Sequence, residues 1–135
     1  MSRAPRNEIC AIVPCYNEAG EIARVVRAVR QHLEVCIVID DCSTDRTSQA
    51  AADAGARVLR HERNLGKGMA LKHGFALASA AGCSAAMTLD GDGQHDPREI
   101  PRFLEAFETG RFDIVLGNRM NHTETMPLVD RKSVV

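Results

Sequence analysis

The segment ICAIVPCYNE, residues 9–18, carries the pattern on which the fold prediction rests. Residues 9–13 are apolar without a break, which is typical of a parallel strand that is covered on both faces. Polar residues follow, and apolar residues then recur at helical spacing from Ile22 to Leu33. We expect Asn17 to cap this helix at its N-terminus. The segment therefore predicts a buried strand, a polar turn and an amphipathic helix in succession.

The same unit recurs along the rest of the chain. Further strands are predicted at 35–39, 85–89 and 113–116, with a weaker candidate at 57–59. Helical patterns separate them, and the predicted helices run over 45–55, follow the glycines of 66–68, and start at the Asp-Pro pair 96–97. This alternation predicts an α/β fold with a doubly wound, mainly parallel sheet. In such folds, ligands bind outside the carboxyl ends of the strands.

The composition is that of an ordinary globular protein and excludes several functional classes. The 135 residues suit one domain, and 44% of them are hydrophobic and 26% charged. The net charge of −1 provides no basic surplus, so we expect no nucleic-acid partner. No apolar run approaches the roughly 20 residues of a membrane-spanning helix, and the tail at 1–8 has no signal-peptide centre. We therefore predict a cytoplasmic protein.

The five cysteines are an odd number and contain no CxxC pair. This spacing predicts neither a disulfide framework nor a structural zinc site. Cys10 and Cys36 lie inside apolar runs, so we expect both to be buried free thiols.

Acidic residues gather where the predicted strands end. Asp40 and Asp41 follow the second strand, the segment 90–94 (DGDGQ) follows the strand at 85–89, and Arg119 follows the last strand. Carboxylates crowded at one edge of a sheet repel one another unless protons or a cation relieve them. A divalent metal relieves them at neutral pH and leaves coordination places for phosphate oxygens.

Three other interpretations of these segments fail on single residues. A calcium loop that starts at Asp90 would place His95 where glycine is required and Pro101 where glutamate is required. The glycines at 66–68 lack the upstream glycine and the following serine or threonine of a phosphate loop. A dinucleotide fold needs GxGxxG after the first strand, where this chain has PCYNE at 14–18.

Five motifs follow one another in chain order. They are Pro14-x-Tyr16-Asn17-Glu18, Asp40-Asp41-x-Ser43-x-Asp45-x-Thr47, Asn64-x-Gly66-Lys67-Gly68-x-Ala70, Asp90-x-Asp92-x-Gln94-His95-x-Pro97 and Gly117-Asn118-Arg119. Together they resemble glycosyltransferase family two. The fourth motif, together with Met126-Pro127 and Arg131-Lys132, looks most like the polyprenyl-phosphate (dolichyl-phosphate) mannosyl- and glucosyltransferases. The resemblance runs from about Ile9 to Ser133 and implies the GT-A fold, a Rossmann-like fold of nucleotide-diphospho-sugar transferases.

The resemblance implies an inverting hexosyltransferase. It would move mannose or glucose from a nucleoside diphosphate sugar, of the GDP-mannose or UDP-glucose class, to a polyprenyl phosphate. Two alternatives stay open: transfer to a saccharide hydroxyl, and nucleotide-sugar binding without turnover. A polyprenyl acceptor also implies peripheral association with the cytoplasmic face of a membrane, and apolar surface left by missing core contacts would favour a homo-oligomer.

The resemblance also assigns roles to individual residues. Asp92 and Gln94 would hold Mg²⁺ or Mn²⁺ against the diphosphate, and Arg119 would neutralise the leaving group, helped by the basic pair at 131–132. Asp90, Asp92 and Arg119 form the predicted catalytic set. The predicted substrate-binding residues are Pro14, Tyr16, Glu18, Ile39, Asp40, Asp41, Asp90, Gly91, Asp92, Gln94, Arg119, Arg131 and Lys132.

The predicted domain boundaries follow from the same motifs. Residues 1–8 form an N-terminal tail, 9–120 form the nucleotide-sugar-binding domain, and 121–135 begin an acceptor-side segment. Because the family fold continues beyond such a segment, we expect the fold to be incomplete at the C-terminus.

Overall fold

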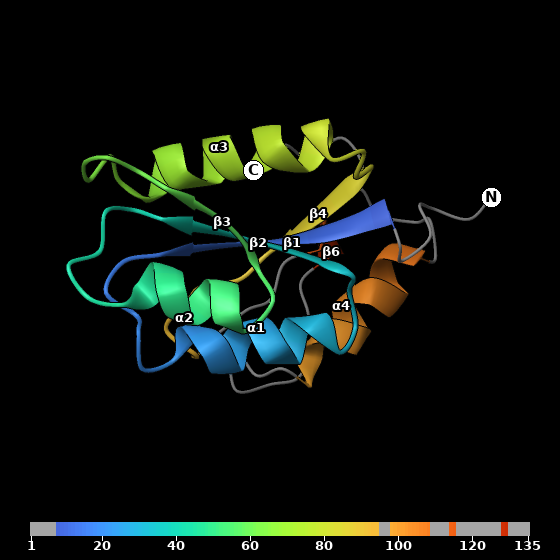
Figure 1. Ribbon diagram of the computed structural model, residues 1–135. Helices are drawn as coiled ribbons and strands as arrows, with labels where there is room; N and C mark the ends of the chain where they lie inside the picture. The colour runs from blue at the N-terminus through green and yellow to red at the C-terminus, as the bar shows by residue number, and fades with distance from the viewer. Residues whose placement is uncertain (1–7, 95–97, 109–113, 116–127, 130–135) are drawn as a thin grey trace.

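The computed structural model describes residues 8–94, 98–108, 114–115 and 128–129 (Figure 1). Strands and helices alternate along the chain, which confirms the predicted α/β class. The elements are β1 (Ile9–Cys15), α1 (Ile22–Arg30), β2 (Val35–Asp40), α2 (Thr47–Asp53), β3 (Arg57–Arg60), α3 (Lys67–Ala80), β4 (Ala85–Thr88), α4 (Glu99–Glu108), β5 (Ile114–Val115) and β6 (Leu128–Val129).

The main sheet has the strand order β3-β2-β1-β4, and its three strand pairs are all parallel. Strand β1 lies inside the sheet and extends two residues beyond its predicted end, because Pro14 and Cys15 still pair with Ile39 and Asp40. Strands β5 and β6 form a separate antiparallel pair. The sequence did not predict β6, since two apolar residues are too short a run to indicate a strand.

Helices cover both faces of the main sheet. Helix α3 lies on one face, and α1, α2 and α4 lie on the other (Figure 1). Alternate residues of β1 point to opposite faces, so Ala11 and Val13 pack on the α1 side while Ile12 packs with Ala70 of α3. All of β1 is buried, as its unbroken apolar run predicts.

The buried stripe of α1 confirms its predicted amphipathic pattern, but its predicted cap is wrong. The helix starts at Ile22, and no side chain caps it. Asn17 instead adopts a left-handed backbone with φ of 53°. Its Oδ1 accepts a hydrogen bond from the Thr44 backbone N–H at 2.8 Å, so the side chain joins two loops and leaves the helix end uncapped.

A glycine allows α3 to lie close against β1. A Cβ built on Gly74 would collide with the Cγ2 atom of Ile12 and contact Ile39. Any larger residue would push the helix away from the sheet. Gly74 therefore fixes the distance between α3 and the two central strands.

Two cysteines contradict the prediction of free thiols. A disulfide joins Cys10 to Cys83, whose Cα atoms lie 6.1 Å apart. The sequence could not show this pairing because 73 positions separate the two residues, and only the pairing of β1 with β4 brings them together. Cys36 is free, as predicted, and burial raises the pKa of its thiol to about 12.

The length and apolar character of the described helices decide whether any of them could cross a membrane. Within residues 8–94 and 98–108, no helix combines the length and the apolar character that crossing a bilayer requires.

Candidate functional site

Within the described residues, the predicted site residues lie at the carboxyl ends of the parallel strands or in the loops that follow them. Strands β1, β2, β3 and β4 end at Cys15, Asp40, Arg60 and Thr88, and the loops after them meet at one edge of the sheet. This edge is where a doubly wound fold binds its ligands.

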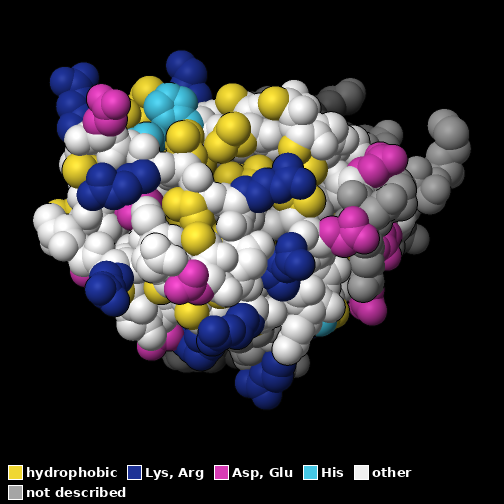
Figure 2. Space-filling model, viewed as in Figure 1, with side chains coloured by type: hydrophobic (Ala, Val, Ile, Leu, Met, Phe, Trp, Pro, Cys, Tyr) yellow, Lys and Arg dark blue, Asp and Glu magenta, His cyan; other side chains and the backbone are white. Residues whose placement is uncertain are grey.

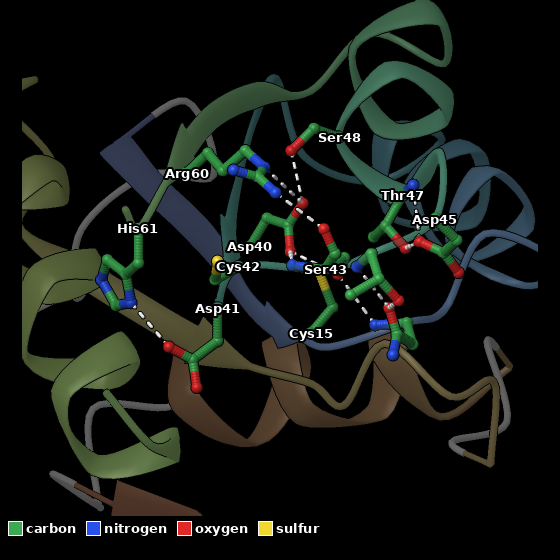
Figure 3. A network of polar contacts seen from close by, with 12 residues as sticks. Cys15, Asp40, Asp41, Cys42, Ser43, Asp45, Thr47, Ser48, Arg60 and His61 are labelled. Carbon is green, nitrogen blue, oxygen red and sulfur yellow. Dashed lines mark hydrogen bonds and ion pairs between the residues drawn. The ribbon is translucent and has the colours of Figure 1, made fainter. Parts of the chain in front are cut away.

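Asp40 and Asp41 are neighbours in sequence but point to opposite sides of the sheet (Figure 3). Asp40 is completely buried. Its Oδ1 accepts hydrogen bonds from the Ser43 hydroxyl at 2.5 Å and the Ser43 backbone N–H at 3.0 Å. Its Oδ2 accepts from the Ser48 hydroxyl at 2.5 Å and lies 3.9 Å from Arg60 Nε. Through these contacts, the Asp40 carboxylate stabilises the turn after β2. The predicted contact of Asp40 with substrate stays a prediction.

The Asp41 carboxylate faces α3 and is held by three donors. Oδ1 contacts His61 Nδ1 at 2.8 Å and accepts from the Leu65 backbone N–H at 2.7 Å. Oδ2 accepts from the Gly66 backbone N–H at 2.9 Å. Burial raises the pKa of this carboxyl, but the hydrogen bonds outweigh burial and hold the pKa of Asp41 below its ordinary value. Asp41 is therefore an ionised acceptor at neutral pH.

The loop after β1 is joined to the loop after β2 by backbone and side-chain hydrogen bonds. The backbone N–H of Asn17 donates to the Ser43 hydroxyl at 2.8 Å, and that of Glu18 donates to the Thr47 hydroxyl at 2.9 Å. Asp45 accepts from the Thr47 backbone at 2.9 Å, and its hydrogen bond with the Thr47 side chain lowers the pKa of the Asp45 carboxyl. The sequence showed these residues as motif positions without showing that they connect two loops.

Negative charge concentrates where the loop after β1 faces the loop after β4. Burial raises the pKa of Glu18, and the nearby charges of Asp92, Asp45 and Glu21 raise it further. The sequence predicted this crowding of carboxylates at the sheet edge. Asp92 Oδ1 accepts from the backbone N–H of Gln94 at 3.0 Å, which orders the short segment between the two predicted metal ligands.

The residues present fit a hard divalent cation bound together with a ligand. Asp92 and Gln94 supply carboxylate and amide oxygens, which suit Mg²⁺ or Mn²⁺. In the described part of the chain, no group of three or more His, Cys, Asp or Glu side chains could hold a metal alone. A cation at Asp92 would thus complete its coordination with oxygens from water and from a ligand such as a diphosphate.

The loop after β4 contains a charge pair and a close approach. Lys67 Nζ, at the start of α3, donates to Asp90 Oδ1 at 2.6 Å. The sequence showed Lys67 only as part of a motif and assigned it no partner. A Cβ on Gly91 would lie 2.8 Å from the Cβ of Cys15, so glycine lets this loop reach the end of β1. The predicted role of Gly91 is thus possible only through its backbone.

The remaining predicted residues differ in accessibility. Tyr16 is 47% exposed beside the site, whereas Pro14 is buried and Ile39 is 0% exposed. Because the Ile39 side chain packs in the core under α3, a ligand could reach only its backbone. Three predicted residues lie outside the described residues: Arg119, Arg131 and Lys132.

Sequence reasoning missed a pair of histidines beside Asp41. His61 follows β3 directly and is 6% exposed. Its Nε2 lies 2.8 Å from Nδ1 of His73 on α3, and the two rings are nearly perpendicular. The available signal was position, since His61 follows the weak strand predicted at 57–59 after one intervening residue, Arg60.

Comparison with known proteins identifies the family. The profile of Glycosyl transferase family 2 matches residues 10–133. The undecaprenyl-phosphate mannosyltransferase of Micrococcus luteus is 32% identical over 118 residues, which are 82% of this chain and 48% of that protein. The dolichol-phosphate mannosyltransferase of Pyrococcus furiosus is 30% identical over 120 residues, 83% of this chain and 33% of that protein.

A solved structure supports the same conclusion. Glucosyl-3-phosphoglycerate synthase of Mycobacterium tuberculosis, in complex with Mn²⁺, uridine diphosphate and glucosyl-3-phosphoglycerate, superposes with a TM-score of 0.64. It is 28% identical, and the match covers 83% of this chain and 43% of that one. The chain spans about half the length of the first curated relatives, between 48% and 54%. The chain belongs to glycosyltransferase family 2 and has the GT-A fold.

Proposed function

We propose that this chain is the donor-binding part of an inverting, metal-assisted hexosyltransferase that moves mannose or glucose from a nucleoside diphosphate sugar to a polyprenyl phosphate. One observation carries the proposal: a single sheet edge holds an ionised hydrogen-bond acceptor, Asp41, and a separate concentration of carboxylates around Asp92. A nucleoside diphosphate has both a hydrogen-bond-donating end and a metal-binding end. The two parts of the edge match these ends.

Asp41 recognises the nucleoside in this proposal. A carboxylate has about four lone-pair sites, and the described structure occupies three of those on Asp41. The site that is left, on Oδ2, can accept a base N–H or a ribose hydroxyl. Exposed Tyr16 lies two residues beyond the buried Pro14 and can pack against the nucleoside.

Asp92 and Gln94 hold the Mg²⁺ or Mn²⁺ ion in this proposal, and Lys67 fixes the orientation of the Asp90 carboxylate. When bound, the metal supplies positive charge that stabilises the nucleoside diphosphate as it leaves the sugar. Arg119, with Arg131 and Lys132, is assigned the same task on the leaving group. Support comes from the synthase neighbour, whose structure contains Mn²⁺ together with uridine diphosphate.

The acceptor assignment rests on the named relatives and on acid–base chemistry. The Micrococcus and Pyrococcus relatives carry the names of polyprenyl-phosphate mannosyltransferases. A phosphate acceptor is already ionised at neutral pH, so it needs little help from a general base. We assign donor binding to 9–120 and the start of the acceptor side to 121–135, and place the reaction at the cytoplasmic face of a membrane.

A second acceptor class is favoured by one observation. The synthase neighbour is named for transfer of glucose to phosphoglycerate, a small hydroxyl acceptor. Transfer to a hydroxyl is therefore the alternative function, and it requires a general base that takes the proton of the acceptor hydroxyl.

Isotope-labelled donors separate these functions. Purified protein is incubated with Mn²⁺ and radiolabelled GDP-mannose or UDP-glucose, together with polyprenyl phosphate, an oligosaccharide or phosphoglycerate. The proposal expects label in the organic phase only with the lipid acceptor. Label in the aqueous acceptors would support the alternative. Binding of both donors is measured in parallel by calorimetry, and failure to bind either donor would refute the proposed function.

A further inference from the structure

Three elements bring Asp41, His61 and His73 into one hydrogen-bonded chain beside the proposed nucleoside pocket. Asp41 follows β2, His61 follows β3, and His73 belongs to α3. The two contacts, Asp41 Oδ1 to His61 Nδ1 and His61 Nε2 to His73 Nδ1, are both 2.8 Å long. The predicted site did not include either histidine.

The direction of the first hydrogen bond follows from the charge on Asp41. An ionised carboxylate can only accept hydrogen bonds, so His61 Nδ1 must carry a proton and donate a hydrogen bond to Oδ1. Neutral His61 then has its lone pair on Nε2 and accepts from His73 Nδ1–H. One added proton keeps both contacts, whereas a proton on every ring nitrogen would set two N–H groups against each other. The contact with Asp41 therefore requires a hydrogen on Nδ1 of His61, and in the neutral pair Nδ1 of His73 carries the hydrogen between the rings.

His61 controls how the Asp41 carboxylate is turned. Among the described residues, it is the side chain that hydrogen-bonds the Asp41 carboxylate, and the other donors to the carboxylate are the backbone N–H groups of Leu65 and Gly66. With His61 and Leu65 both on Oδ1, the site that is left for a ligand falls on Oδ2. Loss of the His61 donor would leave each oxygen with one backbone donor and remove this preference.

His73 in turn holds the His61 ring. The edge-on contact between the rings, with centroids 4.9 Å apart, prevents free rotation of His61. His73 is itself fixed because the next residue, Gly74, lets α3 lie directly on Ile12 of β1. The position of a helix is thus transmitted to a carboxylate at the end of β2.

We propose that His61 is a positioning residue for nucleoside recognition, which orients the Asp41 carboxylate by donating from Nδ1 while His73 locks its ring. This inference rests on the proposed function, since it assumes that Asp41 contacts the nucleoside. It assigns His61 no contact with the sugar, the diphosphate or the metal.

Two substitutions of His61 separate its two contacts. The amide nitrogen of Asn stands as many bonds from Cβ as Nδ1 of histidine, and that of Gln as many as Nε2. His61→Asn therefore keeps a donor toward Asp41. His61→Gln keeps an acceptor toward His73 through its amide oxygen, which stands as many bonds from Cβ as its nitrogen, and loses the donor at the Nδ1 position. Binding of uridine diphosphate and guanosine diphosphate is measured by calorimetry in EDTA, and folding of each variant is checked by its melting temperature.

His61→Gln is expected to weaken metal-free binding about tenfold, which is about 1.4 kcal/mol, while His61→Asn stays within about threefold of wild type. Equal affinities of the two variants would overturn the inference. Should His61→Gln fail to fold, His73→Phe replaces it. The His73→Phe substitution removes the hydrogen-bond partner of His61 Nε2, so we expect it to weaken metal-free binding about threefold. Unchanged affinity of this variant would also overturn the inference.

The free protein provides a spectroscopic readout that needs no ligand. In ¹⁵N-labelled wild type, Nδ1 of the His61 ring is expected to carry a proton. An Nδ1 without a proton would overturn the inference, whatever the binding results. Absence of nucleotide binding by wild-type protein would refute the proposed function instead, so the two failures are distinguishable.

Discussion

The loops after β1 and β2 contrast with the loop after β4. In the first pair, Asp40, Asp41 and Asp45 each accept several hydrogen bonds from neighbouring residues, and the loops bond to each other. In the loop after β4, Asp92 accepts from the backbone of its own loop and lies near Glu18, a like charge. One half of the edge is thus preformed by hydrogen bonds, and we propose that it binds the nucleoside. The other half gathers like charges, and we propose that it binds the diphosphate together with a cation.

The described residues on the face of the molecule in Figure 2 form no extended surface of a single charge. On the face shown in Figure 2, Lys and Arg side chains alternate with Asp and Glu, and apolar side chains gather near α3. Met69, Phe75 and Leu77 of this helix are exposed.

Asp40→Ala is expected to have the largest effect on stability, because the Asp40 carboxylate is completely buried and accepts several hydrogen bonds. The change leaves the hydroxyls of Ser43 and Ser48 without their acceptor. Hydrogen bonds to a buried charged group contribute about 1.5–3 kcal/mol each, so we expect a loss of about 3 kcal/mol in the free energy of unfolding. Urea denaturation measures it. The matched control is Asp53→Ala, whose carboxylate bonds exposed Gln49, and a similar loss there would contradict the account.

Gly74→Ala is expected to have the next largest effect. The added methyl group would collide with Ile12 and displace α3, at a cost of about 1–3 kcal/mol for overpacking. Gly68→Ala, in the same helix, is the control, because an added Cβ there meets nothing within 4 Å. Thermal denaturation should show the Gly74 variant clearly less stable and the Gly68 variant unchanged or slightly more stable. Equal melting temperatures would show that α3 is not held by close contact.

The pH dependence of Asp41 provides a smaller effect with a defined sign. Hydrogen bonds hold the pKa of folded Asp41 below its ordinary value, so its contribution to stability is present above the unfolded pKa, about 3.9. That contribution is lost as pH falls through the folded pKa. The stability difference between wild type and Asp41→Asn, measured in urea, should therefore be constant near neutral pH and shrink in acid. A difference that grew in acid would contradict the charge assigned to Asp41.

Cys42→Gly is expected to produce the smallest change. Cys42 has φ of 68°, a left-handed conformation that costs a non-glycine residue about 1–2 kcal/mol. Glycine relieves this cost but loses about 0.5–1 kcal/mol in conformational entropy, so the net gain should be below about 1 kcal/mol. A melting curve measures it, and a marked loss of stability would show that the contact of Cys42 Sγ with the Glu62 carbonyl matters more.

The sequence predicted the features that depend on local pattern. The buried run at 9–13 and the stripe from Ile22 became β1 and α1 because burial of these residues depends on their own spacing. The strand-end rule likewise placed Asp41 and Asp92 at one edge of the sheet.

The features that the sequence missed depend on pairs of distant residues. The Cys10–Cys83 disulfide and the His61–His73 contact arise only after the strands are ordered in the sheet. The Asn17 cap was wrong because its side chain found a better partner, the Thr44 backbone, in a loop from another strand. Local propensity cannot show such competition.

Calorimetric titration of a nucleoside diphosphate, with EDTA or with Mn²⁺, tests the central claim that the two halves of the edge act separately. Asp41→Asn should weaken binding about tenfold to a hundredfold under both conditions, because it loses a charged hydrogen bond of about 1.5–3 kcal/mol. Asp92→Ala should keep the metal-free affinity of wild type and lose the enhancement by Mn²⁺. Equal enhancement of wild type and Asp92→Ala, or unchanged metal-free affinity of Asp41→Asn, would contradict the account.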